Sequence, residues 1–340
     1  MNFRVFILRI ALFLFSVFCA VAAQPKWISA PHVEYSPKEF MVAVGHGKTL
    51  KDSDLAAVEE LAGQFGRDIR SSSVSSSRMK QAQKNGTLEN STDSSISLDV
   101  QQKVSMEDLV GIEIREHYQE GKEFYSLAVL EKSKASQIFI STIKKNDMLA
   151  SRILKDSKTE EFSMEKVGDL SFARDLALMN EKLVERLKVI DFEKAGQVEK
   201  GMISSVLVKK QIAEITRIIP VYISIRNDVD GKIGAAFASM VSASGFRISD
   251  NPDERYSITG SVEFSRRTTK DNSSFQVNYT LEAALRDSII DEILLPFSLQ
   301  GRSSAANAEN ADVRTIRDIT AKIETTCRVS FLNMLNSGRL

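Results

Sequence analysis

The segment Gly45-His46-Gly47 contains the residue types that could bind a phosphate group. It follows the apolar run 40–44 and precedes a helical pattern, and backbone N–H groups at a helix N-terminus can hold an anion. A dinucleotide-binding loop needs a third glycine in register, and the segment does not fit the P-loop pattern either. We therefore interpret Gly45-His46-Gly47 as a tight structural turn and expect no cofactor there.

Histidine, cysteine and serine give little support for metal or nucleophilic chemistry. His32, His46 and His117 are far apart, and none has a second histidine or a cysteine three or four residues away. A zinc site needs more ligands than this, so we predict no metal site. Cys327 lies on an apolar helical stripe in a half of the chain without histidine, which favours a buried, inert thiol. The chain has no Gly-x-Ser-x-Gly motif, and we predict no catalytic residues and no enzyme activity.

The remaining charged residues have two interpretations, solvated surface or contact with a partner. The carboxylate pairs Glu59-Glu60 and Glu160-Glu161 are typical of exposed helix surface. Two further groups could be either: Glu113, Arg115 and His117 on one face of a predicted strand, and Arg226, Asp228 and Asp230 in one predicted loop.

The first 23 residues have the order of a secretory signal peptide. Arg4 and Arg9 form a basic start, residues 10–20 are almost wholly apolar, and Val21-Ala22-Ala23 supplies small residues before Gln24. The apolar run is short for a membrane span, which needs about 20 residues. Cys19 follows Phe18, although a lipidated cysteine normally follows a small residue. We expect cleavage near Ala23 and an exported, unlipidated protein.

Composition excludes some classes of function for the exported chain. The full chain has 45 basic and 45 acidic residues. Removing residues 1–23 takes away two arginines and no acidic residue, which leaves the exported chain with a net charge near −2. Nucleic-acid binders are typically basic, so we expect no nucleic-acid partner. Cys327 is then the one cysteine, which excludes an intramolecular disulfide. A length of roughly 315 residues predicts two domains.

Hydrophobic periodicity predicts a β-α-β-β-β order for the first domain. The strand at 40–44 is followed by a helix with Thr49 as N-cap and an apolar face at Leu55, Val58, Leu61 and Phe65. Alternation predicts strands at 96–100, 110–114 and 124–130, with a hairpin turn at 119–122. Residues 69–77 are serine-rich and compatible with a strand, and 83–95 have loop composition.

Helical patterns then separate this domain from a second one. Helices are predicted at 133–155 and 163–189, the latter a connector with the stripe Leu170, Leu176, Leu183, Leu187 and Ile190. Strands follow at 221–225, 256–264, 275–285 and 294–299, with a helix stopping at Gly245 after the first. The last helix, 311–335, has the predicted stripe Val313, Ile316, Ile319, Ile323, Cys327, Phe331 and Met334.

The first domain resembles the bacterial lipoprotein family called LPP-twenty. The resemblance covers about 130 residues and rests on Pro25-Lys26-Trp27, Phe40-x-x-Ala-Val-Gly-x-Gly47, and the segments 109–118 and 124–131. It implies an envelope protein, commonly attached to the outer membrane and sometimes linked to flagellar structures. The second domain is loosely similar to the α+β modules of curli-secretion-component and penicillin-binding-protein-activator proteins.

These observations predict an α+β fold in which each domain is an antiparallel sheet with helices on one face. The expected divisions are a signal peptide at 1–23, an LPP-twenty-like domain at 24–160, a helical connector at 161–204 and a second α+β domain at 205–340. We expect a non-catalytic adaptor or scaffold in a bacterial envelope, in the periplasm or associated with the outer membrane. Its expected partners are other envelope proteins, with homo-oligomerisation left open. The alternative is a periplasmic enzyme or small-ligand sensor.

Overall fold

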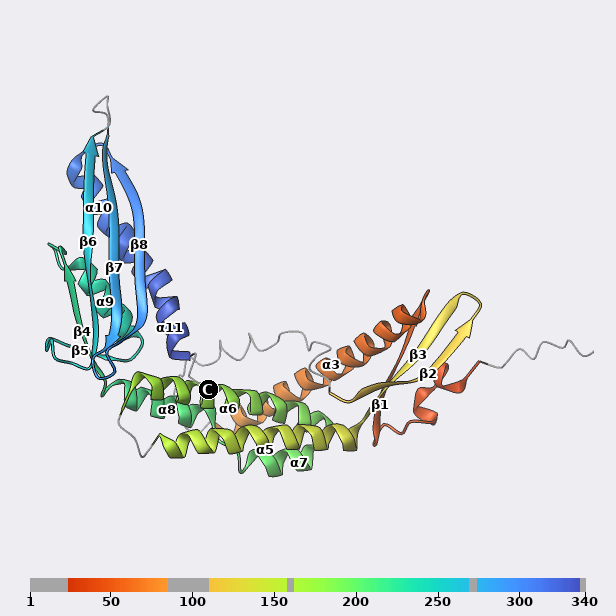
Figure 1. The fold of residues 1–340 in the computed structure, drawn as a ribbon. Coiled ribbons are helices and arrows are strands. Elements are labelled where there is room, and N and C mark those ends of the chain that lie inside the picture. The colour runs from red at the N-terminus through yellow and green to blue at the C-terminus, as the bar shows by residue number, and fades with distance from the viewer. Residues whose placement is uncertain (1–23, 85–109, 158–161, 269–273, 337–340) are drawn as a thin grey trace, which may run out of the picture. The chain divides into compact units, whose positions relative to one another are not determined.

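The computed structural model describes residues 24–84, 110–157, 162–268 and 274–336 (Figure 1). The predicted signal peptide, the strand at 96–100 and most of the loops at 83–95 and 271–274 lie outside these residues. The described chain forms two compact units: residues up to Phe139 with Glu185–Ala195, and Ile140–Val184 with Gly196 onward. Each unit has its own sheet and helices, which confirms the α+β class. The predicted domain boundaries stay predictions.

Unit 1 is built on a three-stranded antiparallel sheet in the order β1-β3-β2. The strands are β1 (Phe40–Gly47), β2 (Ile112–Glu120) and β3 (Glu123–Glu131), and a turn with Gly121 at φ +60° joins the last two. The two short helices α2 (Lys26–Ser29) and η1 (Pro31–Val33) precede the sheet. The strands and the hairpin turn agree with the hydrophobic alternation of the sequence.

Both faces of the central strand β3 are covered. On one face Trp27 packs with Val42, Leu127 and Val129, so the chain just before β1 closes that side. On the other face the long helix α3 (Leu50–Lys84) contacts β1 and β3. Its buried residues include Ala57, Leu61 and Phe65.

Two predictions for α3 are wrong. Leu55 is exposed rather than buried, because Ala57 takes the position that faces the sheet. Residues 69–77 are helical rather than strand-like. From Arg67 to Lys84 the sequence has no glycine or proline to end a helix, and an existing helix extends at the cost of ordering one residue per hydrogen bond.

Four helices follow β3. They are α5 (Lys132–Asp156), α6 (Met164–Ile190), α7 (Phe192–Glu199) and α8 (Ser205–Thr216). The predicted stripe of α6 is buried throughout, from Leu170 to Ile190. Buried Asn180 of α6 accepts a hydrogen bond from Asn146 at 2.9 Å and donates one to the carbonyl of Ile143 at 3.1 Å. These bonds fix the register between α5 and α6. None of the helices in the described part of the chain has the length and apolar content needed to cross a bilayer.

Unit 2 contains a five-stranded sheet in the order β5-β4-β6-β7-β8. The strands are β4 (Pro220–Arg226), β5 (Arg247–Ser249), β6 (Tyr256–Thr268), β7 (Phe275–Asp287) and β8 (Glu292–Ala305). The pairs β6·β7 and β7·β8 are antiparallel, as predicted. However, β4 runs parallel to both β5 and β6, so the sheet is mixed. The reason is the helix after β4, which carries the chain back and allows a parallel return.

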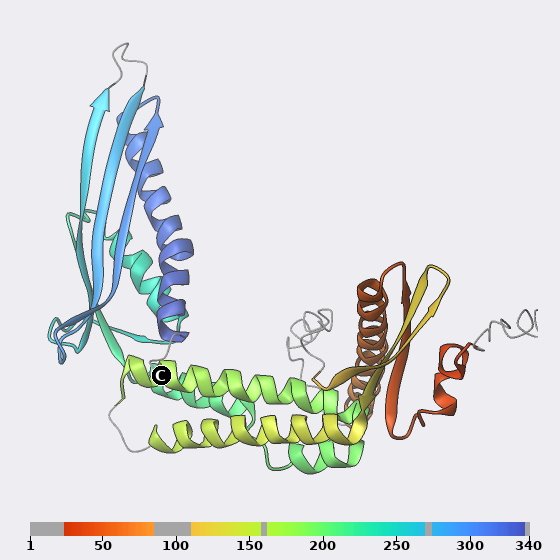
Figure 2. The ribbon, with the colours of Figure 1, turned by 45° about the vertical axis from the view of Figure 1, so that its right-hand side comes forward.

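Three helical segments pack on one side of this sheet: α9 (Lys232–Ala243), α10 (Ala308–Lys322) and α11 (Arg328–Asn336) (Figure 2). Helix α9 buries Ile233, Phe237, Met240 and Val241 as predicted. Gly245, at φ +93°, follows it, and Phe246 packs back as its N–H bonds to the carbonyl of Val241. This is the helix stop expected from the sequence.

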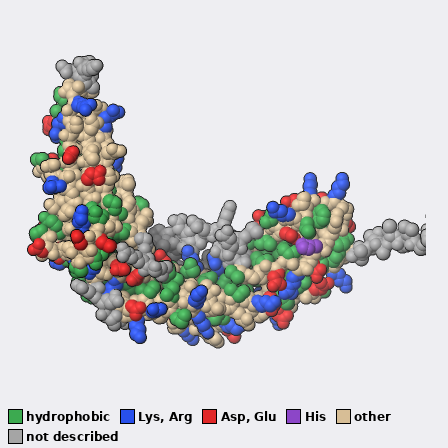
Figure 3. Space-filling model, viewed as in Figure 1, with side chains coloured by type: hydrophobic (Ala, Val, Ile, Leu, Met, Phe, Trp, Pro, Cys, Tyr) green, Lys and Arg blue, Asp and Glu red, His purple; other side chains and the backbone are tan. Residues whose placement is uncertain are grey.

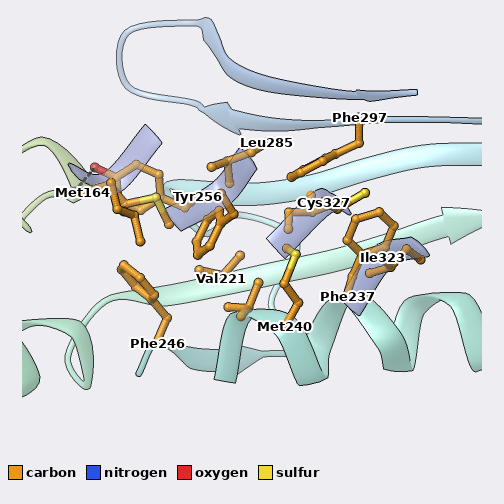
Figure 4. Close-up of a cluster of buried hydrophobic side chains, with 14 of the residues drawn as sticks. Met164, Val221, Phe237, Met240, Phe246, Tyr256, Leu285, Phe297, Ile323 and Cys327 are labelled. Atoms are coloured by element: carbon orange, nitrogen blue, oxygen red, sulfur yellow. Dashed lines mark hydrogen bonds between the residues drawn. The ribbon is translucent and has the colours of Figure 1, made fainter. Parts of the chain in front are cut away.

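The C-terminal helix is buried at every fourth position, which confirms Ile319, Ile323, Cys327 and Phe331 of the predicted stripe. The buried residues are Ala311, Thr315, Ile319, Ile323, Cys327, Phe331 and Leu335, whereas Val313 is exposed. In a regular α-helix, positions four apart drift by about 40° around the axis. The π-helical turn η4 (Ile323–Cys327) between α10 and α11 is wider and counteracts this drift. Cys327 and Ile323 thereby reach the same core as Phe237, Met240 and Phe297 (Figure 4).

Candidate functional site

The glycine pair lies inside a strand, not in the predicted turn. Both Gly45 and Gly47 belong to β1 and pair with Ser126 and Phe124 of β3. A Cβ on Gly45 would collide with the backbone of Ser53 and Ala57, and one on Gly47 would lie 2.6 Å from the Cβ of Asp52. The glycines therefore allow α3 to approach β1 with its backbone. Gly45 and Gly47 thus have a structural role in the close packing of α3 on β1, and the predicted turn at this position is wrong.

The residues after the pair form the start of α3. Lys48 and Thr49 make a Gly-Lys-Thr sequence with Gly47, so the segment does contain the lysine-threonine pair of a P-loop. Buried Val42 stands where a P-loop would need its first glycine. Thr49 Oγ1 accepts the N–H of Asp52 at 3.2 Å, which confirms it as the N-cap.

A hydrogen-bonded chain links α3 to the hairpin in unit 1. His117 Nε2 lies 2.8 Å from Asp54 Oδ1, and Ser126 Oγ donates to the same oxygen at 2.6 Å. Buried Ser53 lies 2.7 Å from Ser126 Oγ. The carboxylate stands between the imidazole and the serines, whereas nucleophilic catalysis places the imidazole next to the hydroxyl. Sequence reasoning had no signal for this chain, because its members come from three elements.

A β-bulge moves His117 away from the other two charged residues expected on one face of β2. The register shifts between Ile114 and Glu116, so Arg115 is the extra residue. Glu113 pairs with Val129 on the Trp27 side, whereas His117 pairs with Ser126 on the α3 side. The prediction of a shared face is therefore wrong for His117, whereas Glu113 and Arg115 lie 3.5 Å apart. The Arg115 guanidinium lies 6.0 Å from the ring centroid of Tyr35 and 5.6 Å from that of Phe40.

Tyr279, Asp318 and Lys322 form a polar cluster between β7 and α10. Tyr279 donates to Asp318 Oδ2 at 2.5 Å, and Lys322 Nζ lies 2.7 Å from the phenolic oxygen and 2.9 Å from Asp318. Burial, followed by the Asp318 contact, raises the pKa of Tyr279. Hydrogen bonds to Tyr279 and then Asp318 raise the pKa of Lys322. A tyrosine kept protonated beside a charged lysine is suited to joining helix and sheet.

The second polar cluster of unit 2 surrounds Asp287. Arg255 binds this carboxylate through Nε at 3.0 Å and through Nη2 at 2.9 Å. Burial raises the pKa of Asp287, but the bonds from Arg255 and the Ile289 N–H outweigh it and leave the pKa below its ordinary value. The neighbouring Tyr256 hydroxyl accepts the N–H of Met164 at 3.0 Å, and burial raises its pKa to about 12. This cluster ties the start of α6 to the sheet.

The predicted loop of charged residues after β4 caps a helix. Asp228 Oδ2 accepts the N–H of Gly234 at 2.7 Å in the first turn of α9, and Lys232 pairs with Asp230 at 3.3 Å. The described residues contain no group of three or more His, Cys, Asp or Glu side chains that could hold a metal.

The face of the β6-β7-β8 sheet opposite the helices is the candidate interaction surface. Inward residues such as Val262, Leu281 and Leu299 are buried in one cross-strand row. The outward residues are exposed or half-buried and mostly neutral and polar. Their rows across the three strands are Ser261-Glu282-Ser298, Glu263-Thr280-Gln300, Ser265-Asn278-Arg302 and Arg267-Gln276-Ser304. We call these four rows the polar sheet face.

Comparison with known proteins gives likeness to solved structures alone. The chain matches no protein-family model and no curated protein, so the resemblance to the LPP-twenty family stays a prediction. The secreted protein HP1454 from Helicobacter pylori is 12% identical, with 86% of this chain and 97% of that chain covered and a TM-score of 0.44. A minor lipoprotein from Acinetobacter baumannii is 15% identical over 33% of this chain and 92% of its own, with a TM-score of 0.28. The rare lipoprotein B from Shewanella oneidensis is 10% identical, with 34% of this chain and 98% of that chain covered and a TM-score of 0.26. These similar structures are bacterial lipoproteins and a secreted protein, and at such identities and TM-scores the likeness carries no function.

Proposed function

We propose that this chain is an exported, non-catalytic protein of the bacterial envelope that acts as an adaptor by binding another envelope protein. Export is supported by the order of basic, apolar and small residues in positions 1–23. The expected location is the periplasm or the periplasmic surface of the outer membrane.

The observation that carries the adaptor role is the polar sheet face. It combines hydroxyl and amide side chains with a few charges of both signs, so it can make many hydrogen bonds at little desolvation cost for each. Thr280 and Gln300 are exposed and adjacent in one row. Hydrogen-bonding residues spread over neighbouring strands of one sheet face suit a flat macromolecular partner, whereas a small ligand is normally held in a concave site.

The proposal that the protein is not an enzyme is supported by the hydrogen bonds and pKa directions of its titratable side chains. Asp54, Asp287 and Asp318 each accept bonds from side chains of other elements. The pKa directions of Tyr279, Lys322, Asp287 and Asp318 hold each group in its ordinary protonation state near neutral pH. General acid–base catalysis instead favours groups whose pKa lies close to the working pH.

Site-specific photo-crosslinking in cells tests the proposal. A photoreactive residue replaces Thr280 or Gln300 on the polar sheet face, and Thr326, exposed on the helical side, serves as the matched control. We expect the two face positions to give the same discrete adduct, identified by mass spectrometry, and Thr326 not to give it. Adducts equal at all three positions, or absent from both face positions, would overturn the adaptor surface.

A further inference from the structure

Five large apolar side chains stand exposed at one end of the unit 2 sheet. Single exposed apolar residues are ordinary on protein surfaces, but several together mark interaction sites. Between 44% and 61% of each residue's surface is exposed in the set Phe162, Ile218, Ile289, Ile290 and Ile293. We call this set the isoleucine end.

The topology brings these residues to the row that contains Tyr256. Tyr256 pairs with Val221 on one side and with Asp287 on the other, and Asp287 pairs with Glu292. Ile218 precedes Val221 by three residues, and Phe162 precedes Met164, whose N–H bonds to Tyr256, by two. Ile289 and Ile290 lie in the β7-β8 turn, and Ile293 is the second residue of β8. Hydrophobic side chains are visible over the base of this sheet in Figure 3.

The β7-β8 turn is held in a conformation that keeps the isoleucines outside. The Ile289 N–H bonds to Asp287 Oδ1 at 3.0 Å, and the Ser288 N–H bonds to the carbonyl of Arg255 at 2.8 Å. Asp291 adopts φ +53°, a left-handed conformation that is uncommon for a residue other than glycine. A turn fixed on both sides keeps the isoleucines on the surface, where a second molecule could cover them.

The charged residues around the isoleucines favour one kind of binding partner for this surface. Arg286 lies directly opposite Ile293, and Asp291 and Glu292 lie between Ile290 and Ile293. A two-fold contact centred on the isoleucines would bring the arginine of each copy towards the acids of the other. Asp253 and Glu254 add negative charge near Arg255 at this end, which disfavours an anionic bilayer.

We propose that the isoleucine end binds a second copy of this chain and forms a two-fold dimer. Such a contact needs about 800 Å² per subunit, with the five apolar residues as its dry centre and the charged residues as its rim. This inference does not depend on the adaptor role.

Sedimentation velocity of the purified protein at about 1 to 200 µM tests the dimer. We expect a concentration-dependent dimer whose dissociation constant rises about 30-fold or more in Ile290→Asp and Ile293→Asp, as for buried anchor residues. Arg286→Glu should weaken the dimer by a smaller factor. Val229→Asp is the matched control, because Val229 is 95% exposed and follows the opposite end of β4; it should leave the dissociation constant unchanged.

Three results would overturn the dimer. The first is a monomer over the whole concentration range, and the second is a dimer that both isoleucine variants leave intact while circular dichroism shows a native fold. The third is binding of a monomer to vesicles of phosphatidylethanolamine and phosphatidylglycerol that Ile290→Asp abolishes, which would assign the isoleucine end to a bilayer. Crosslinks at Thr280 are unaffected by any of these results, so the adaptor role is tested separately.

Discussion

Gly45 of β1 and Ala57 of α3 are in direct backbone contact, and no side chain fits between them. Gly45→Ala should therefore destabilise the protein by about 3 kcal/mol or more, because the added methyl group meets backbone atoms that cannot rotate away. Urea unfolding measures the loss. Gly63→Ala, in the facing helix α3, is the matched control: its Cβ would meet only the tip of Arg67 at 3.4 Å. It should stabilise α3 by about 0.5–1 kcal/mol.

The imidazole of His46 should be dispensable, because the close packing of α3 on β1 needs Gly45 and Gly47 and not the exposed side chain between them. His46→Ala should keep the unfolding free energy within about 0.5 kcal/mol of the natural protein, as for other exposed sites, and should leave function in cells intact. Loss of function at normal protein abundance would favour the ligand-binding or enzyme alternative.

The Asp287 carboxylate should make the free energy of unfolding depend on pH in the acid range. Its pKa in the folded protein is below the ordinary 3.8, so its bonds to Arg255 stabilise the fold above that pH and are lost as pH falls through the folded pKa. Asp287→Asn should cost about 3 kcal/mol at pH 7, and the difference from the natural protein should shrink below pH 3.8. Exposed Asp253→Asn is the control, and equal losses from the two variants would contradict the assignment.

Cys327 should be inert in the native protein. Burial raises its thiol pKa to about 11, so little thiolate is present at neutral pH, and the side chain is buried in the core. A maleimide should label the native protein slowly and the urea-unfolded protein fast. Fast labelling of the native protein would show that the C-terminal helix opens or that Cys327 is accessible.

N-terminal sequencing of the exported protein tests the signal peptide. The sequence should begin within two or three residues of Gln24, because Val21-Ala22-Ala23 supplies the small residues that the cleavage site needs. A start at Cys19 with a covalent lipid would contradict this and make the protein a lipoprotein.

The sequence by itself determined the elements whose periodicity is local. The alternation in 256–264 and 275–285 became β6 and β7, and the helix predicted at 163–189 became α6 with its predicted residues buried. Gly245 and Phe246 identified the end of α9, because a left-handed residue and the apolar residue behind it are adjacent in the chain.

The tertiary structure alone decided features that depend on residues far apart. The bulge at Arg115 reverses which side chains share a face, since a single extra residue changes the parity of a strand. The π-helical turn keeps Cys327 in line with Ile319 and Ile323 in the core, and Val313 is exposed because the sheet buries Ala311 and Thr315 of α10 instead. The close approach of α3 to Gly45, the Asp54–Ser126 bond and the gathering at the isoleucine end arise only when separate elements pack together. Hydrophobic periodicity records which face of an element is buried, but not which neighbour buries it.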